Sequence, residues 1–291
     1  MKKKNILLVL PLLMVVFTTG CAHKDIMGKD SIIDFSYEAD NFSEIEIKNI
    51  RLKSGIVTYG PKVNLLPGSE KKITISMDEN FENEIKVKKV GNKKIIQGNE
   101  LHNLVTDRFD INLYGYVLSD IDLSGACEAN VSSLCLDKNK LDIDLSGASK
   151  ITLDSYDGVN LHCDLSGASS IDVGNCNLEN ANIELSGASK VNFANLKTNK
   201  LDLDLSGAST ISLLLGSANT FLADISGASD VKANMFEVET GNVDISGASS
   251  MYIKVNQSLT GEVSGASTLK YSGEGEVKVD VSGGSTAKKI M

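Results

Sequence analysis

The sequence predicts an all-β protein, a parallel β-solenoid in which about nine short coils stack along a single rod. Three observations predict this fold: a short phrase that returns at a nearly fixed period, aliphatic residues that alternate on both sides of it, and the absence of proline after Pro67. Such a period indicates repeats that bury their apolar faces only by stacking on their neighbours. The phrase is Ser-Gly-Ala-Ser or a close variant, and it begins at Ser124, Ser146, Ser166, Ser186, Ser206, Ser226, Ser246, Ser264 and Ser282.

The spacing of the phrase sets the size of each coil. The first step, from Ser124 to Ser146, is 22 residues, the next five steps are 20 residues and the last two are 18. A unit this short cannot hold a helix as well as its strands. The Gly-Ala pair predicts a corner at which small side chains let the backbone bend and stack closely.

The residues on either side of the phrase alternate between apolar and polar. The position before each phrase is always Leu, Ile or Val, and apolar residues also lie two and four positions earlier, as in Leu141-x-Ile143-x-Leu145. The alternation resumes after the phrase, as in Ile151-x-Leu153. A period of two predicts strands with one buried face. An antiparallel sandwich is the main alternative, but a sandwich does not need the same corner residues in every repeat.

The region before the first phrase predicts an irregular β cap. Within residues 32–118, strand-like runs such as Ile45-x-Ile47 and Ile73-x-Ile75 are separated by turns, for example at Gly91-Asn92. Solenoids need an atypical end that covers the first coil. We therefore expect this cap to lead into the regular repeats at 119–291, and residues 21–31 to form a tether in front of it.

Residues 1–20 are typical of an export signal and are not expected to belong to the fold. Three lysines, Lys2 to Lys4, precede an apolar run at residues 6–17, and Thr18-Thr19-Gly20-Cys21 resembles the cleavage site of bacterial lipoproteins. In that class the cysteine is lipidated, so Cys21 is expected to anchor the protein on a membrane of the cell envelope, facing the periplasm or the cell surface. An ordinary secretory signal is the alternative, and the apolar run is too short for a transmembrane helix.

The composition suits a narrow solenoid and argues against some functions. The chain has 291 residues with 42% hydrophobic content, 5% aromatic residues and no Trp. A net charge of −9, with Arg51 and Arg108 as the only arginines, argues against nucleic-acid binding. Four cysteines follow Cys21, and no two of them align in adjacent coils, so we expect buried free thiols rather than disulfides. They are Cys127, Cys135, Cys163 and Cys176.

A carboxylate stands two residues before the first Ser of every phrase, and these carboxylates form the candidate ligand or cation site. Asp is a poor strand former, so its return in every coil needs a reason. Period two places the Asp and the Ser of Asp-x-Ser on the outward face, where like charges about 4.8 Å apart repel by about 1 kcal/mol per pair in water. Serine donors, raised pKa values or bound cations would offset this repulsion. The residues are Asp122, Asp144, Asp164, Glu184, Asp204, Asp224, Asp244, Glu262 and Asp280.

Three interpretations of these carboxylates are open. They form a solvated strand face that keeps rods from associating, or a weak strip for Ca²⁺, since hard cations take several carboxylate and hydroxyl oxygens. The third is a glycosidase, because retaining enzymes place two carboxyl groups about 5–5.5 Å apart. No carboxylate differs from its stacked equivalents, however, and the repeats contain no Arg or Trp to hold a sugar. We therefore expect no catalytic residue, no resident metal and no cofactor.

The chain resembles a known bacterial family over residues 32–285. The segments Phe42-x-x-Ile45-x-Ile47, Val63-x-Leu65-x-Pro67-Gly68 and Ile73-x-Ile75-x-x-Asp78-Glu79-Asn80, followed by the Ser-Gly-Ala phrases, are similar to the putative auto-transporter adhesin, head GIN domain family. The resemblance implies a right-handed β-helix that is exported and often lipid-anchored, and it supplies no catalytic residues. The sequence thus predicts a non-enzymatic, adhesin-like protein that binds a surface glycan or protein. A polysaccharide-processing enzyme and a cation-binding envelope protein are the alternatives.

Overall fold

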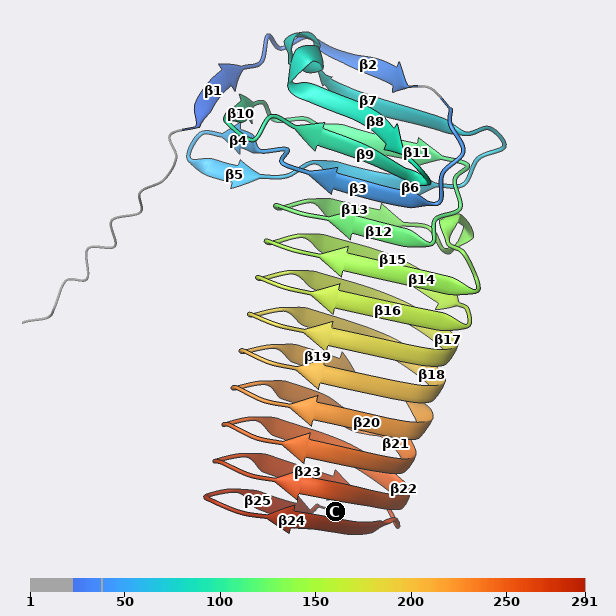
Figure 1. Ribbon diagram of the computed structural model, residues 1–291, viewed down its shortest axis with the longest axis vertical. Helices are drawn as coiled ribbons and strands as arrows, with labels where there is room; N and C mark the ends of the chain where they lie inside the picture. Colours follow the sequence, from blue (N-terminus) through green and yellow to red (C-terminus); the bar gives the residue numbers. More distant parts are fainter. Residues whose placement is uncertain (1–22, 38, 291) are drawn as a thin grey trace, which may run out of the picture.

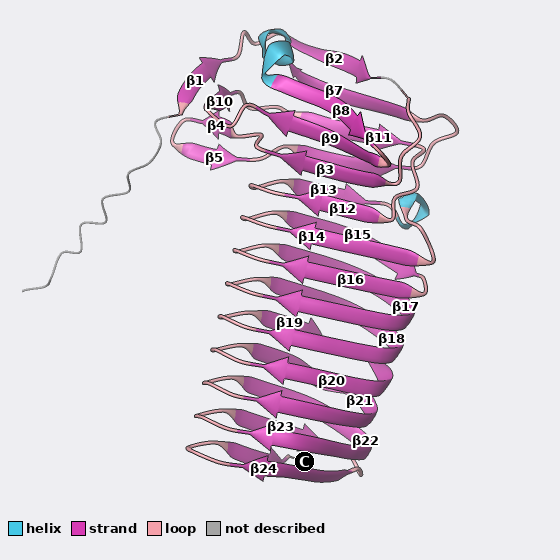
Figure 2. Ribbon diagram, in the orientation of Figure 1, coloured by secondary structure: helices cyan, strands magenta, loops and turns pink. Residues whose placement is uncertain are grey.

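The computed structural model describes residues 23–37 and 39–290, which form a rod of stacked coils with a wider N-terminal cap (Figure 1). Two 3₁₀ helices interrupt the strands, η1 (Glu79–Glu84) and η2 (Ser133–Cys135) (Figure 2). Within the described part of the chain, no helix has the length and apolar character needed to cross a membrane. The predicted signal segment and Cys21 lie outside the described residues.

The strands of the rod belong to one 21-stranded sheet that winds round the core, and we call its two long sides face A and face B. Each coil runs along face A, turns at the Ser-Gly-Ala corner, and runs back along face B before a third short segment returns it to face A. Face A contains β12 (Asp120–Leu123), β14 (Lys140–Leu145), β16 (Asn160–Leu165) and β24 (Glu276–Val281), and β20 (Gly216–Ile225) enters it from the third segment. Face B contains β13 (Glu128–Val131), β15 (Lys150–Asp157), β19 (Thr210–Leu213), β23 (Thr268–Ser272) and β25 (Thr286–Lys289). The strands that run from face B round to face A are β17 (Ser170–Leu185), β18 (Lys190–Leu205), β21 (Asp230–Ile245) and β22 (Ser250–Val263).

Equivalent residues of successive coils lie directly over one another, as the period predicts. Ile143 of β14 pairs with Cys163 of β16, and Cys163 pairs with Ile183 of β17. The rod has about eight turns, close to the expected nine. Strands in front point to the left and strands behind point to the right as the chain descends in Figure 1, so the winding is right-handed. The structure therefore confirms the predicted parallel β-helix.

The phrase builds a stacked corner that depends on its glycine. Gly187 has a φ of 70°, and a Cβ added to it would lie 2.5 Å from the carbonyl oxygen of Gly167 in the preceding coil. The amide of Ala188 donates to the same carbonyl at 2.7 Å. Only a residue without a side chain satisfies both the left-handed backbone and this close approach.

The second Ser of the phrase closes the corner from inside. Ser189 is 1% exposed, and its hydroxyl donates to the carbonyl of Ser186 at 2.8 Å. Cys127 takes this place in the first phrase, where its thiol lies 3.4 Å from the carbonyl of Ser124. These hydroxyls are therefore part of the fold and do not face solvent.

We expect Ser189→Ala to lower the free energy of unfolding by about 1 kcal/mol, because the substitution removes a buried hydrogen bond and leaves the Ser186 carbonyl without that donor. Urea unfolding followed by circular dichroism measures this as a lower midpoint at an unchanged slope. Ser170→Ala, at the half-buried first position of β17, is the matched control and should shift the midpoint little. Equal midpoints for the two variants would contradict the structural role of Ser189.

One continuous core fills the rod. It runs from Phe42 near the cap to Leu269 near the other end and consists mainly of Leu, Ile and Val. The few large aromatic side chains inside, such as Phe193 and Phe221, are fully buried. All four described cysteines are free and buried. Burial raises the pKa of the Cys127 thiol to about 12, so this side chain behaves as a small apolar group.

Antiparallel strands close the N-terminal end of both faces. On face A, β8 pairs antiparallel with β9, and β9 pairs with β3, which continues the parallel stack onto β12. On face B, β7 pairs antiparallel with β2 on one side and with β11 on the other. Strand β11 then pairs parallel with β6, and β6 pairs parallel with β13. The bounds are β2 (Ile32–Tyr37), β3 (Glu44–Lys48), β6 (Lys62–Leu66), β7 (Lys72–Asp78), β8 (Ile85–Val90), β9 (Lys93–Gly98) and β11 (Asp110–Tyr114).

A second, four-stranded sheet, in the order β1-β10-β4-β5, forms one side of the cap. The range 21–31 is expected to be a tether, but Lys24–Met27 form β1, which pairs with β10 over its whole length. The half-buried Ile26 packs against the core and fixes this strand. At the opposite end of the rod, β24 and β25 pair only with β22 and β23, so the last coil leaves an uncovered edge in the described structure. The remaining bounds are β10 (His102–Val105), β4 (Leu52–Ser54) and β5 (Val57–Tyr59).

Candidate binding face

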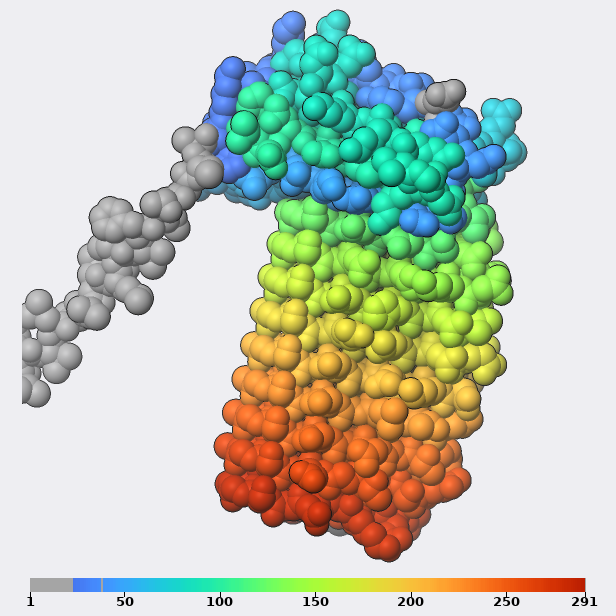
Figure 3. Space-filling view, in the orientation of Figure 1, coloured from blue at the N-terminus to red at the C-terminus, as the bar shows by residue number. Residues whose placement is uncertain are grey.

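The nine carboxylates singled out in the sequence form one column on the outer surface of face A, which we call the acidic column. Asp144 pairs with Asp122 on one side and with Asp164 on the other, and this register continues to Asp280, which pairs with Glu262. Face A is the side turned to the viewer in Figure 3, where its side chains follow the coils in even rows below the wider cap. Neighbouring carboxylates are therefore one strand spacing apart, about 4.8 Å.

Sequence reasoning missed one member of the acidic column. Glu46 of β3 pairs with Asp122, so the column extends into the cap. No Ser-Gly-Ala phrase follows Glu46, and a search anchored on the phrase cannot find it. The alternation Glu44-Ile45-Glu46-Ile47 matches Asp120-Ile121-Asp122-Leu123 and is the pattern that could have identified this residue.

The hydroxyls of the phrase bind the backbone, not the carboxylates. Ser186 Oγ donates to the carbonyl of Leu165 at 3.4 Å, and Ser226 Oγ donates to that of Leu205 at 3.3 Å. Within residues 23–37 and 39–290, no hydrogen bond joins a phrase hydroxyl to the acidic column. Most of the acidic column is exposed, so solvent screens most of the repulsion between its carboxylates.

The carboxylates of the acidic column that lie next to the cap have raised pKa values. Burial, together with the charges of Glu46 and Asp144, raises the pKa of Asp122 to about 6. Burial also raises the pKa of Asp120 and of Asp144, with neighbouring carboxylates as a further cause. Among the described residues, no three His, Cys, Asp or Glu side chains converge in a way that could hold a metal ion.

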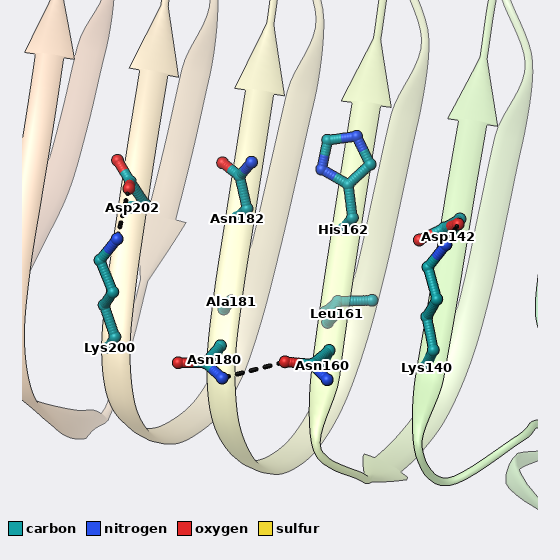
Figure 4. A pocket seen from close by; sticks show the side chains of 10 residues that line it. All are labelled: Lys140, Asp142, Asn160, Leu161, His162, Asn180, Ala181, Asn182, Lys200 and Asp202. Carbon is teal, nitrogen blue, oxygen red and sulfur yellow. Dashed lines mark hydrogen bonds and ion pairs between the residues drawn. The ribbon is translucent and has the colours of Figure 1, made fainter.

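A shallow hollow of about 480 Å³ lies beside the acidic column on the same face and crosses β14, β16, β17 and β18 (Figure 4). We call it the cradle. Each of its strands contributes two outward side chains, and the buried Leu161 and Ala181 form its floor. Sequence reasoning did not single out this site, because its residues belong to no repeated motif. The outward side chains are Lys140 and Asp142, Asn160 and His162, Asn180 and Asn182, and Lys200 and Asp202.

The two ends of the cradle are closed by ion pairs within a strand. Lys200 Nζ lies 2.9 Å from Asp202 Oδ2, and Lys140 makes the same pair with Asp142. In the middle, Asn180 Nδ2 donates to Asn160 Oδ1 at 2.9 Å, and Asn160 Nδ2 donates to the carbonyl of Asn139 at 3.1 Å. These contacts fix the amide orientations. The centre of the cradle therefore presents amide and imidazole groups between two paired charges (Figure 4).

The fold and the face define a class: a right-handed parallel β-solenoid with a regular polar flank. The chain belongs to the family described as putative auto-transporter adhesin, head GIN domain, whose model matches residues 56–214 and 173–275. The members' description as adhesins is consistent with a place at the cell surface or in the envelope. No protein of curated function matches the chain.

Several solved structures share the fold. A putative adhesin from Parabacteroides distasonis is similar with a TM-score of 0.68 and 13% identity, and one from Parabacteroides merdae with 0.65 and 17%. A putative lipid binding protein from Parabacteroides distasonis gives 0.66 and 15%. Each comparison covers 92% of this chain and 100% of the other. At these identities the likeness concerns the fold.

Proposed function

We propose that this protein is a non-enzymatic, lipid-anchored binding protein of the cell envelope, which holds a surface glycan or protein through contacts repeated along face A. The observation that supports it most is the coil-by-coil register of outward polar side chains, from Glu46 to Asp280. Identical groups at a constant spacing favour multivalent attachment, in which repetition raises the overall affinity without any strong single contact. The family description and the names of the structural relatives agree with this role.

The chemistry of the phrase also argues against an enzyme. The second Ser is buried, and its hydroxyl is engaged by the backbone, as at Ser189. A serine nucleophile needs a base within hydrogen-bond reach and an accessible hydroxyl.

The anchor is tested by Cys21→Ser in cells that express the full chain. We expect the wild-type protein to be in the membrane fraction and to incorporate a fatty-acid label, because two or more acyl chains give stable membrane binding. The variant should lose the label and move to the soluble exported fraction. Equal labelling and equal membrane retention of the two proteins would overturn the lipid anchor.

Ligand binding is tested with the purified protein on arrays of glycans and extracellular-matrix proteins. The protein should bind at least one class of ligand far better when many copies of that ligand are displayed together than when single copies are displayed, since attachment along face A is multivalent. The absence of binding to either array at high display density would overturn the proposed function. Turnover of a bound polysaccharide would also contradict it, by favouring an enzyme.

A further inference from the structure

In the cradle, two coils with uncharged side chains lie between two coils that carry ion pairs. The positions two residues before the acidic column are Glu44, Asp120 and Asp142 in the coils nearest the cap, and their negative charge returns at Asp202. Between them stand His162 and Asn182. The adjacent position shows the same change, from Lys140 to two asparagines and back to Lys200. Two neighbouring coils of the cradle thus carry uncharged groups at both positions, and an ion-paired coil lies on each side of them. Beyond Asp202 the same position is again uncharged, at Leu222, Asn242 and Thr260, so the charged ends are what distinguish the cradle from the rest of the face.

Hydrogen-bonding capacity remains free at the centre of the cradle. The bond between Asn180 and Asn160 uses one amide donor and one amide acceptor, which leaves the Asn180 Oδ1 oxygen as an acceptor. Asn182 Nδ2 donates to Glu184 Oε1 at 3.2 Å, and this bond leaves the Asn182 Oδ1 oxygen as a second acceptor. His162 has no hydrogen-bond partner in the part of the chain that the structure describes. An imidazole supplies a donor and an acceptor, and an amide supplies two of each. The cradle therefore offers donors and acceptors side by side.

The charges around the cradle narrow the class of ligand. Asp144, Asp164, Glu184 and Asp204 run along one side and disfavour an anion. A cation finds no group of three ligating side chains among the described residues. An uncharged ligand rich in hydroxyls fits best, because each hydroxyl can both donate and accept a hydrogen bond.

The shape of the cradle indicates a linear ligand. It crosses four neighbouring strands, so its long direction follows the rod and spans three strand steps, about 14 Å. We propose that the cradle binds an uncharged, unbranched oligosaccharide that lies along the rod axis, with its hydroxyls on Asn160, His162, Asn180 and Asn182. This inference rests on the proposed binding function and assigns it a ligand class and a place.

The test is calorimetric titration of the purified full chain with hexasaccharides. The uncharged probes are linear glucan, mannan, xylan and chitin oligomers, and hexagalacturonate is the anionic probe. We expect at least one uncharged probe to bind and the anionic probe to bind at least tenfold more weakly. His162→Ala combined with Asn182→Ala should weaken the uncharged probe about tenfold or more, because it removes several polar contacts.

A matched control separates a local effect from a general one. Asn242→Ala combined with Thr260→Ala changes the same position of face A on β21 and β22, outside the cradle, and should leave affinity within about twofold. Equal melting temperatures would show that all variants are folded. Stronger binding of hexagalacturonate, no binding of any uncharged probe, or equal losses in both double variants would overturn the cradle assignment. If the variant with His162→Ala and Asn182→Ala binds the glycan and protein arrays as the wild type does, this inference is overturned and the proposed function is retained.

Discussion

Gly187→Ala is expected to lower the free energy of unfolding by at least about 3 kcal/mol. The left-handed backbone at this corner costs a residue with a side chain about 1–2 kcal/mol. In addition, the new Cβ would lie 2.5 Å from the Gly167 carbonyl oxygen, so two stacked coils must separate. Steric overlap inside a packed structure that cannot relax is one of the few causes of such large losses. Chemical unfolding of the purified variant measures the change.

Gly125→Ala is the control that separates backbone strain from stacking. Gly125 also has a positive φ, 95°, but a Cβ added to it meets no atom within 4 Å. This variant should lose about 1 kcal/mol, the cost of the backbone conformation alone. If the two substitutions were equally destabilising, coil-on-coil contact at the corner would not be the reason for the glycine.

Asp122→Asn is expected to stabilise the protein by about 2 kcal/mol at pH 7.5. Burial and the neighbouring Glu46 and Asp144 raise the folded-state pKa of Asp122 to about 6, above the ordinary value of 3.8. Its ionised form therefore opposes folding, and each pKa unit corresponds to about 1.4 kcal/mol. We expect less than the full value, since solvent reaches part of this side chain. Asparagine keeps the shape and removes the charge.

The effect of Asp122→Asn should depend on pH in a defined direction. Above about pH 6 the wild-type carboxylate is ionised in the folded protein, and the advantage of the variant is complete. As the pH falls from 6 towards 4, the folded wild type takes up a proton before the unfolded chain does, and the advantage disappears. Glu262→Gln, at an exposed position of the acidic column, should change stability little at any pH. An advantage that persisted at pH 4 would contradict this explanation.

The repeated part of the fold could be predicted because one phrase fixes the register of every coil. Once Ser146, Ser166 and Ser186 are known to lie over one another, the inward Leu145 and the outward Asp144 follow from the period of two. The burial of the second Ser could not be predicted in this way, since the corner breaks the alternation. Strand β1 could not be predicted either, because the alternation of apolar and polar residues over four positions is too short to indicate pairing with β10.

The cradle shows a different limit of sequence reasoning. Its residues are 20 positions apart along the chain, and each belongs to a strand that looks ordinary by itself. Asn160, Asn180 and Lys200 become a site only when the coils are stacked and the change in charge is followed along the rod. A repeat draws attention to the residues that recur, whereas a binding site in a repeat protein can consist of the residues that differ.

The uncovered last coil has a consequence for how such a rod changes in length. Each coil contacts only its two neighbours, and the antiparallel cap contacts only the first coils. Duplication of one 20-residue unit would therefore move the coil of β24 and β25 outward by about 4.8 Å and leave the coils between the unit and the cap in place. The length of the rod can therefore change by duplication in small, equal increments that leave the side chains of the other coils unchanged.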